Sequence, residues 1–206
     1  MPVRSLRILF AFFLASSCGA FAQAQHDPAV AMAAQVEAMK AFAAIDGVWR
    51  GPAWTLLPNG EKRNIIQTER IGGFLGGSVK MVEGRGYNAD GSVGFNALGI
   101  ISFNPATKAY TIRSYALGHA GDFPIRPTAE GYQWEIPAGP GAIIRYTATV
   151  RDGTLHEVGD RVVADRPPLR IFEMDLKRVG DTSWPSAEAV PPKQRQESER
   201  PNGASP

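Results

Sequence analysis

The sequence is nearly free of cysteine. The single cysteine among its 206 residues is Cys18, close to the N-terminus. Residues 1–24 around it have the layout of a secretory signal peptide: a basic start, a short apolar run and two overlapping Ala-x-Ala patterns that end at Ala22 and Ala24. Removal of this segment leaves a mature chain without disulfides and without a thiol nucleophile. We therefore expect a periplasmic or secreted protein that is stabilised by its core alone.

A lipid anchor on Cys18 is the alternative fate of this segment. A lipoprotein signal needs an aliphatic residue three positions before the cysteine, but Ala15 stands there and Leu14 lies one position too early. Soluble export is the preferred interpretation.

An excess of charge of one sign is missing as well. The chain has 22 basic and 20 acidic residues, and two of the basic ones, Arg4 and Arg7, lie in the signal segment, so the mature chain is balanced at 20 against 20. Without a basic stripe there is no electrostatic attraction toward nucleic acid or an anionic membrane. The apolar run at residues 8–15 is too short to span a bilayer, so we expect no stable membrane insertion after processing.

Motifs of catalysis and metal binding are absent too. No Gly-x-Ser-x-Gly nucleophile elbow occurs, and the three histidines, His26, His119 and His156, form no His-x-His pair. The sequence therefore predicts no metal, no cofactor and no catalytic residue.

The sequence does contain a predicted N-terminal helix followed by a long series of predicted strands. Residues 28–44 contain no glycine and are rich in good helix formers, and Asp27 and Pro28 favour a helix start there. We expect an N-terminal helix within residues 25–44 that lies across the mouth of a barrel. Period-two alternation then predicts strands at residues 48–57, 63–71, 78–87, 93–103, 109–117, 132–136, 142–151, 155–164 and 169–179.

The connections between these strands predict how they pair. Turns such as Asp152-Gly153 are so short that neighbouring strands must be antiparallel. Many consecutive strands leave unpaired edges unless the sheet closes on itself. The predicted fold class is therefore all-β, an antiparallel up-and-down calycin-like barrel over residues 45–179.

Two segments do not follow the strand pattern. Residues 118–127 include Pro124 and Pro127, and we expect a loop or a kinked edge strand there. Residues 180–206 are rich in Pro, Ser, Glu and Gln, which predicts a disordered tail in which Trp184 is mobile.

An ordered series of short motifs resembles a known group of barrels. The series is Gly-Val-Trp-Arg-Gly at residues 47–51, Gly-Gly-Phe-Leu at 72–75, Leu-Gly-Ile at 98–100 and Asn-Pro-Ala-Thr-Lys-Ala-Tyr at 104–110. The opening Gly-x-Trp resembles calycin-type barrels, lipocalins among them, and the whole series is similar to the secreted DUF1579 family. The resemblance implies a lipocalin-like barrel with a cavity for a small apolar molecule, and it carries no established activity.

Three residues near the end of one strand are candidates for ligand binding. Arg113 and Tyr115 share a strand face and point toward the same end as His119, which lies between glycines. Together they could hold a carboxylate head group at the barrel mouth. The alternative is a salt bridge at the barrel end beside a solvated loop. Trp49 is expected to plug the opposite end, and the resemblance to lipocalins implies that Arg170 or Arg178 covers it through a cation–π contact.

Two further groups keep an enzymatic or haem-binding function open. Glu69, Glu83 and Arg85 lie on adjacent predicted strands and would form a charge cluster inside the barrel if both strands turn that face inward. The alternative is a structural ion network. The opening Gly-x-Trp-x-Gly also resembles nitrobindin-type barrels, which ligate haem through a histidine on a late strand, and His156 lies on the penultimate predicted strand here. The preferred function is nevertheless a binding module for a small hydrophobic or amphipathic molecule.

Overall fold

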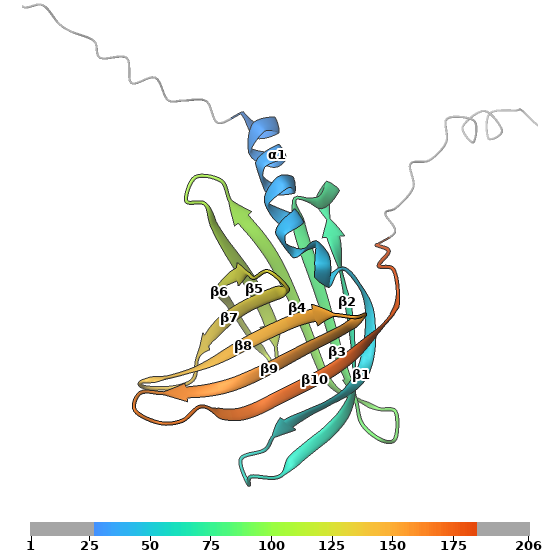
Figure 1. The fold of residues 1–206 in the computed structure, drawn as a ribbon, viewed down its shortest axis with the longest axis vertical. Helices are drawn as coiled ribbons and strands as arrows, with labels where there is room; N and C mark the ends of the chain where they lie inside the picture. The colour runs from blue at the N-terminus through green and yellow to red at the C-terminus, as the bar shows by residue number, and fades with distance from the viewer. Residues whose placement is uncertain (1–26, 185–206) are drawn as a thin grey trace, which may run out of the picture.

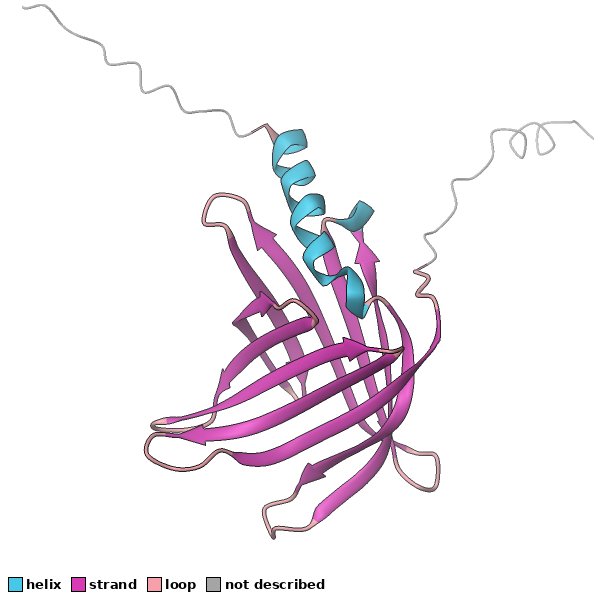
Figure 2. Ribbon diagram, in the orientation of Figure 1, coloured by secondary structure: helices cyan, strands magenta, loops and turns pink. Residues whose placement is uncertain are grey.

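Ten antiparallel strands form one closed barrel with a short helix at one end (Figures 1 and 2). The computed structural model describes residues 27–184. The strands are β1 (Gly47–Leu56), β2 (Lys62–Phe74), β3 (Val79–Tyr87), β4 (Val93–Asn104), β5 (Ala109–Ala116), β6 (His119–Pro127), β7 (Gly131–Pro137), β8 (Ala142–Arg151), β9 (Thr154–Val163) and β10 (Leu169–Gly180). Each strand pairs with its neighbours in sequence, and β1 closes the barrel by pairing with β10. The predicted all-β, up-and-down barrel is confirmed.

Helix α1 (Pro28–Met39) and the 3-10 turn η1 (Lys40–Ile45) cover the end of the barrel at which β1 begins. The side chain of Asp27 caps the helix by accepting a hydrogen bond of 2.9 Å from the Ala29 amide. The hydroxyl of Tyr110 donates to the carbonyl of Ala38 (3.2 Å), which ties the helix to β5. We call this end of the barrel the capped end and the opposite end the far end.

Trp49 is buried at the capped end, as predicted for the residue that plugs the barrel. Its side chain is 1% exposed, and its indole Nε1 donates a hydrogen bond of 2.9 Å to the carbonyl of Ile45 in η1. Arg178 is its cross-strand neighbour on β10, but its guanidinium donates to Asp181. The cation–π contacts found within residues 27–184 involve Trp54, Trp184 and Tyr115, so the predicted cover on Trp49 is not formed.

Residues 119–127 depart from the prediction, because they form the regular strand β6 and not a loop or an edge. Six of its residues pair with β5 and three with β7. Pro124 points outward and is exposed, and it pairs with Thr111 without breaking the strand. The two prolines shorten the pairing with β7 and leave the closure of the barrel intact.

The start of the predicted tail also departs from the prediction. The guanidinium of Arg70 lies 3.8 Å from the ring centre of Trp184, and the ring of Phe74 meets it edge-on at 6.4 Å. Trp184 therefore packs on the outside of β2. The predicted signal peptide, Cys18 and the rest of the tail lie outside the described residues.

Candidate functional site

The interior of the barrel contains four polar side chains in one place. They are Gln67 and Glu69 on β2, Tyr132 on β7 and Glu157 on β9, and we call them the buried polar cluster. Gln67, Glu69 and Glu157 are only 2%, 7% and 8% exposed. Each points inward because it alternates along its strand with outward-facing neighbours. Unpaired charges are rarely buried this deeply, so the cluster is the feature of the interior that packing alone does not explain.

Glycines on β3 make room for the side chains from β2. A Cβ atom at Gly84 would lie 2.8 Å from Oε1 of Glu69, and one at Gly86 would lie 3.2 Å from Oε1 of Gln67. The Gln67 amide donates a hydrogen bond of 2.7 Å to Glu69 Oε1. Gln67 Oε1 is fully buried and has no hydrogen-bond partner among residues 27–184. The interior therefore presents an unused acceptor beside a carboxylate.

Burial shifts the protonation of both carboxyl groups. Loss of hydration is the main cause that raises the pKa of Glu69 to about 8. The hydrogen bond from the Gln67 amide opposes this shift, and the negative charge of Glu157 acts in the same direction as burial. Loss of hydration likewise raises the pKa of Glu157 to about 7, against hydrogen bonds from Tyr132 and Trp134 that favour its ionised form. Near neutral pH, Glu69 is therefore mostly protonated and Glu157 is divided between its two forms.

No basic side chain neutralises these carboxylates within the described residues. None of the ion pairs found over residues 27–184 includes Glu69 or Glu157. The buried Lys80 faces the interior nearer the capped end, where its ammonium is bonded to Asp46. The negative charge available inside the barrel is consequently unmatched.

A row of aromatic side chains lines the interior between the cluster and the far end. Phe123, Trp134, Tyr146 and Phe172 come from β6, β7, β8 and β10, and we call them the aromatic wall. Neighbouring ring centres are 5.9, 4.8 and 6.1 Å apart, and the Trp134 and Tyr146 rings are stacked at 18°. On β9, Gly159 lets two of the rings meet, because a Cβ there would lie 2.8 Å from the Tyr146 ring. All four side chains are only half-buried although they face inward, so solvent reaches this part of the interior.

The sequence analysis considered Glu69 and Glu83 as a pair of carboxylates inside the barrel, and this is wrong for Glu83. Glu69 faces inward, but its cross-strand partner on β3 is Gly84, and Glu83 is paired with Arg70. Glu83 thus points outward, where it accepts from Arg70 (2.9 Å) and Arg85 (2.7 Å). These contacts hold the pKa of Glu83 below its ordinary value despite partial burial. The second carboxylate of the interior is Glu157, which the sequence analysis did not single out.

His156 does not face the interior either. It alternates with the buried Leu155 and Glu157, and its Nδ1 lies 2.8 Å from Oδ1 of Asp175 on the outside of β10. A haem inside the barrel cannot be ligated from this position. Ligand atoms of His156, Asp175 and Glu173 lie within 4.8 Å of one another, but Arg170 is also 3.5 Å from Glu173 and competes with a metal ion there.

The three residues predicted to bind a ligand lie close in sequence but on different faces. Arg113 points outward, donates to the Tyr115 hydroxyl (2.7 Å) and forms an ion pair with Asp122 on β6 (2.8 Å). His119 is the cross-strand partner of the inward-facing Ala116 at the rim of the far end. The salt bridge that was the alternative interpretation is therefore present, and ligand binding by these residues stays a prediction.

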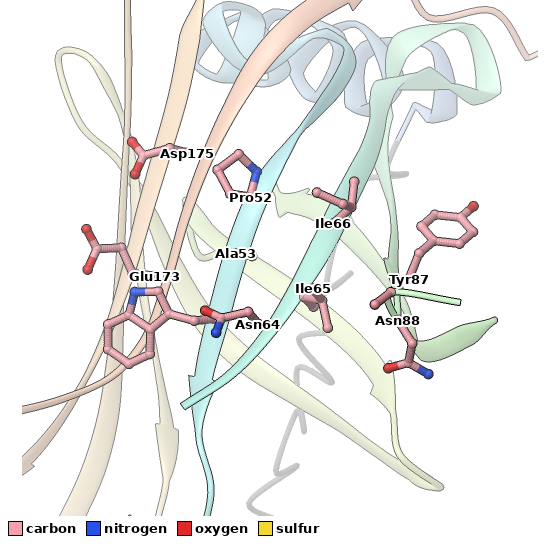
Figure 3. A pocket seen from close by; sticks show the side chains of 11 residues that line it. Pro52, Ala53, Asn64, Ile65, Ile66, Tyr87, Asn88, Glu173 and Asp175 are labelled. Atoms are coloured by element: carbon pink, nitrogen blue, oxygen red, sulfur yellow. The ribbon is translucent and has the colours of Figure 1, made fainter. Parts of the chain in front are cut away.

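The outer surface carries a groove across β10, β1, β2 and β3 (Figure 3). Its volume is about 390 Å³, and Pro52, Ile66 and Tyr87 line it together with the acidic side chains of Glu173 and Asp175. Trp54 also lines it, with the Lys62 ammonium 3.5 Å from the ring centre. A second outer groove of about 610 Å³ lies over β2 to β5 and includes Tyr115 and Trp184. Both are shallow surface features, distinct from the interior cluster.

Comparison with models of known protein families and with curated proteins finds no match for this chain. None of the helices within residues 27–184 is long and apolar enough to cross a lipid bilayer.

Proposed function

We propose that this chain is an exported barrel that binds a small hydrophobic or amphipathic molecule in its interior, and that it is related to the DUF1579 barrels that its motifs resemble. The observation that supports this most is the aromatic wall. Side chains of a purely structural core are fully buried, as Leu155, Leu176 and Ala148 are, whereas the aromatic wall faces inward and still meets solvent. A ligand would remove this apolar surface from water.

The two ends of the interior suit an amphipathic molecule. The polar cluster lies deeper than the aromatic wall, because Tyr132 and Glu157 are nearer the capped end than Trp134 and Gly159 on the same strands. An apolar body packed on the wall would therefore place a polar head group against the cluster. Burial of roughly 200 Å² of apolar surface at about 25 cal/mol per Å² contributes about 5 kcal/mol toward binding, and contacts of the head group with the cluster add to it against the entropic cost of association.

Binding is tested with the neutral fluorescent probe N-phenyl-1-naphthylamine. The inward-facing Ala116 is replaced by tryptophan (Ala116→Trp) to fill the interior near the far end, and the outward-facing, exposed Ala120 on the neighbouring strand is replaced by tryptophan (Ala120→Trp) as the matched control. We expect the wild type and Ala120→Trp to bind the probe with similar affinity and Ala116→Trp to bind at least tenfold more weakly. Equal binding by all three proteins would place the probe on the outer surface and refute the proposal.

Export is tested separately in the native host. Cell fractionation with N-terminal sequencing should find a protein outside the cytoplasm that begins at Gln23 or Gln25, after one of the two Ala-x-Ala patterns. A cytoplasmic protein that retains its first residues would contradict export and leave the binding proposal untouched.

A further inference from the structure

We propose that the head group received by the buried polar cluster is a hydrogen-bond-donating cation, an ammonium or amidinium carried on an apolar body. This inference rests on the proposed function, because it names the class of molecule that the interior binds. It is carried by the unused acceptor at Gln67, by the unmatched carboxylates of Glu69 and Glu157, and by the aromatic wall.

The hydrogen-bonding capacity of the cluster calls for donors. The amide of Gln67 already donates to Glu69, while Gln67 Oε1 is buried without a partner. Tyr132 and Trp134 lower the pKa of Glu157 and so favour its ionised form. A buried acceptor left without a donor is destabilising, and the carboxylate of Glu69 offers further acceptor sites when ionised. A head group with several N–H donors satisfies Gln67 and the ionised Glu69 together, whereas a carboxylate head group, which only accepts, leaves Gln67 Oε1 without a donor.

The charged and titratable groups around the cluster also favour a cationic ligand. Tyr132 and Tyr146 contribute hydroxyls from β7 and β8, the only inward-facing titratable groups that those strands bring to the cluster within the described residues. Lys80 on β3 is already matched by Asp46, and the inner faces of β1 and β10 beside the cluster contribute Gly51, Ala53 and Met174, which carry no charge. From the outer face, the charge of Glu83 raises the pKa of Glu69, and His156 lowers the pKa of Glu157. A cationic ligand is therefore the missing partner of the two carboxylates.

The aromatic wall favours a cation next to it. The stacked rings of Trp134 and Tyr146 are partly exposed and lie on the far side of Glu157, and the negative faces of aromatic rings attract cations. An aromatic amidinium would thus contact rings with its body and carboxylates with its head.

The test uses three small molecules of the same shape and different charge. Benzamidine is a cation, benzamide is neutral and benzoate is an anion, and their competition with N-phenyl-1-naphthylamine is measured at pH 8. We expect benzamidine to compete at least tenfold better than benzamide, and benzoate to compete least. In Glu69→Gln the preference of benzamidine over benzamide should fall to about twofold, while the outward Glu83→Gln keeps the wild-type ratio.

The outcomes separate this inference from the proposed function. If the probe binds inside the barrel but benzamide or benzoate competes as well as benzamidine, the inference is overturned and the proposed function stands. If the probe does not bind the wild type at all, the proposed function is refuted, and the inference that rests on it falls with it. A wild-type preference for benzamidine that survives in Glu69→Gln would also refute the assigned role of Glu69. Circular dichroism of each variant verifies that it is folded before its ratio is interpreted.

A proton-release measurement gives an independent readout. A bound cation stabilises the ionised form of Glu69, whose pKa burial raises to about 8, so benzamidine binding at pH 7 should release protons. Calorimetric titrations in buffers of different ionisation enthalpy report this release directly. Proton uptake, or no exchange, would contradict a cation at this site.

Discussion

Replacing Glu69 by glutamine should change how the stability of the protein depends on pH. Burial raises the pKa of this carboxyl from 4.5 to about 8, so between these values the folded state binds more protons than the unfolded state. Stability is therefore fully present below about pH 4.5 and is lost as the pH rises toward 8. Each pKa unit corresponds to about 1.4 kcal/mol, which gives a loss on the order of 3 kcal/mol at pH 7 and 5 kcal/mol above pH 8.

Glutamine has the shape of glutamate without its titration, and it can keep the contact with Gln67. The free energy of unfolding of Glu69→Gln should equal that of the wild type at pH 5 within about 1 kcal/mol and exceed it by several kcal/mol at pH 9. Urea titrations followed by tryptophan fluorescence at pH 5, 7 and 9 measure this difference. Glu157 titrates in both proteins, and because its charge acts on Glu69 the difference between the two curves belongs to the pair.

The control is Glu83→Gln on the outer face. The pKa of Glu83 is lowered by its contacts with Arg70 and Arg85, so its contribution is present above its ordinary pKa and is lost on acidification, which is the opposite sign. This variant should be slightly less stable than the wild type at pH 7 to 9, by about 1 kcal/mol or less for a partly exposed pair. Parallel stability curves for Glu69→Gln and the wild type from pH 5 to 9 would refute the buried, unmatched carboxylate.

Three further changes test the packing on which the site depends, each by urea denaturation. Trp49→Phe removes the hydrogen bond to Ile45 but keeps most of the ring packing, and should lower the free energy of unfolding by about 1–2 kcal/mol, whereas Trp49→Ala should lower it by about 3–5 kcal/mol; an unchanged stability of Trp49→Phe would deny the bond a role. Gly84→Ala should lower the free energy of unfolding by about 1–3 kcal/mol because the new Cβ meets Glu69, whereas Gly73→Ala, where the nearest atom lies 3.5 Å from the new Cβ, should leave it unchanged. An unchanged stability of Gly84→Ala would mean that the Glu69 carboxylate lies elsewhere. Trp184→Ala should cost about 1–2 kcal/mol through its contacts with Arg70 and Phe74, and no effect would return Trp184 to the mobile tail that its composition predicts.

The strand pattern of the sequence predicts the barrel well because alternation and short turns are local signals. Strands such as β8 and β4 lie where the period of two and the flanking turns place them. The strand β6 is missed because Pro124 and Pro127 are signals of irregular structure. Closure of the barrel supplies pairing partners on both sides of that segment, and this tertiary effect overrides the local preference.

The buried polar cluster is harder to predict from the sequence. The inward position of Glu157 follows from a turn in the sequence, whereas that of Glu69 does not. The two-residue turn Asp152-Gly153 fixes the register of β8 and β9, so that Ala148 pairs with Glu157. Because Ala148 lies on the apolar inner face of β8, that register places Glu157 inside, and this signal was available in the sequence. No such turn joins β2 and β3, where η2 (Leu75–Gly77) intervenes, so the sequence does not decide whether Glu69 faces Gly84 or Glu83.

The most direct test of the account is to observe which tryptophan responds to a ligand. The indole of Trp134 lies in the aromatic wall and lowers the pKa of Glu157, whereas Trp54 and Trp184 line grooves on the outer surface. In nuclear magnetic resonance spectra of protein labelled with nitrogen-15 at tryptophan, added N-phenyl-1-naphthylamine should shift the indole N–H signal of Trp134 and leave those of Trp54 and Trp184 in place. Shifts confined to Trp54 or Trp184 would place binding on the outer surface and contradict a ligand site inside the barrel.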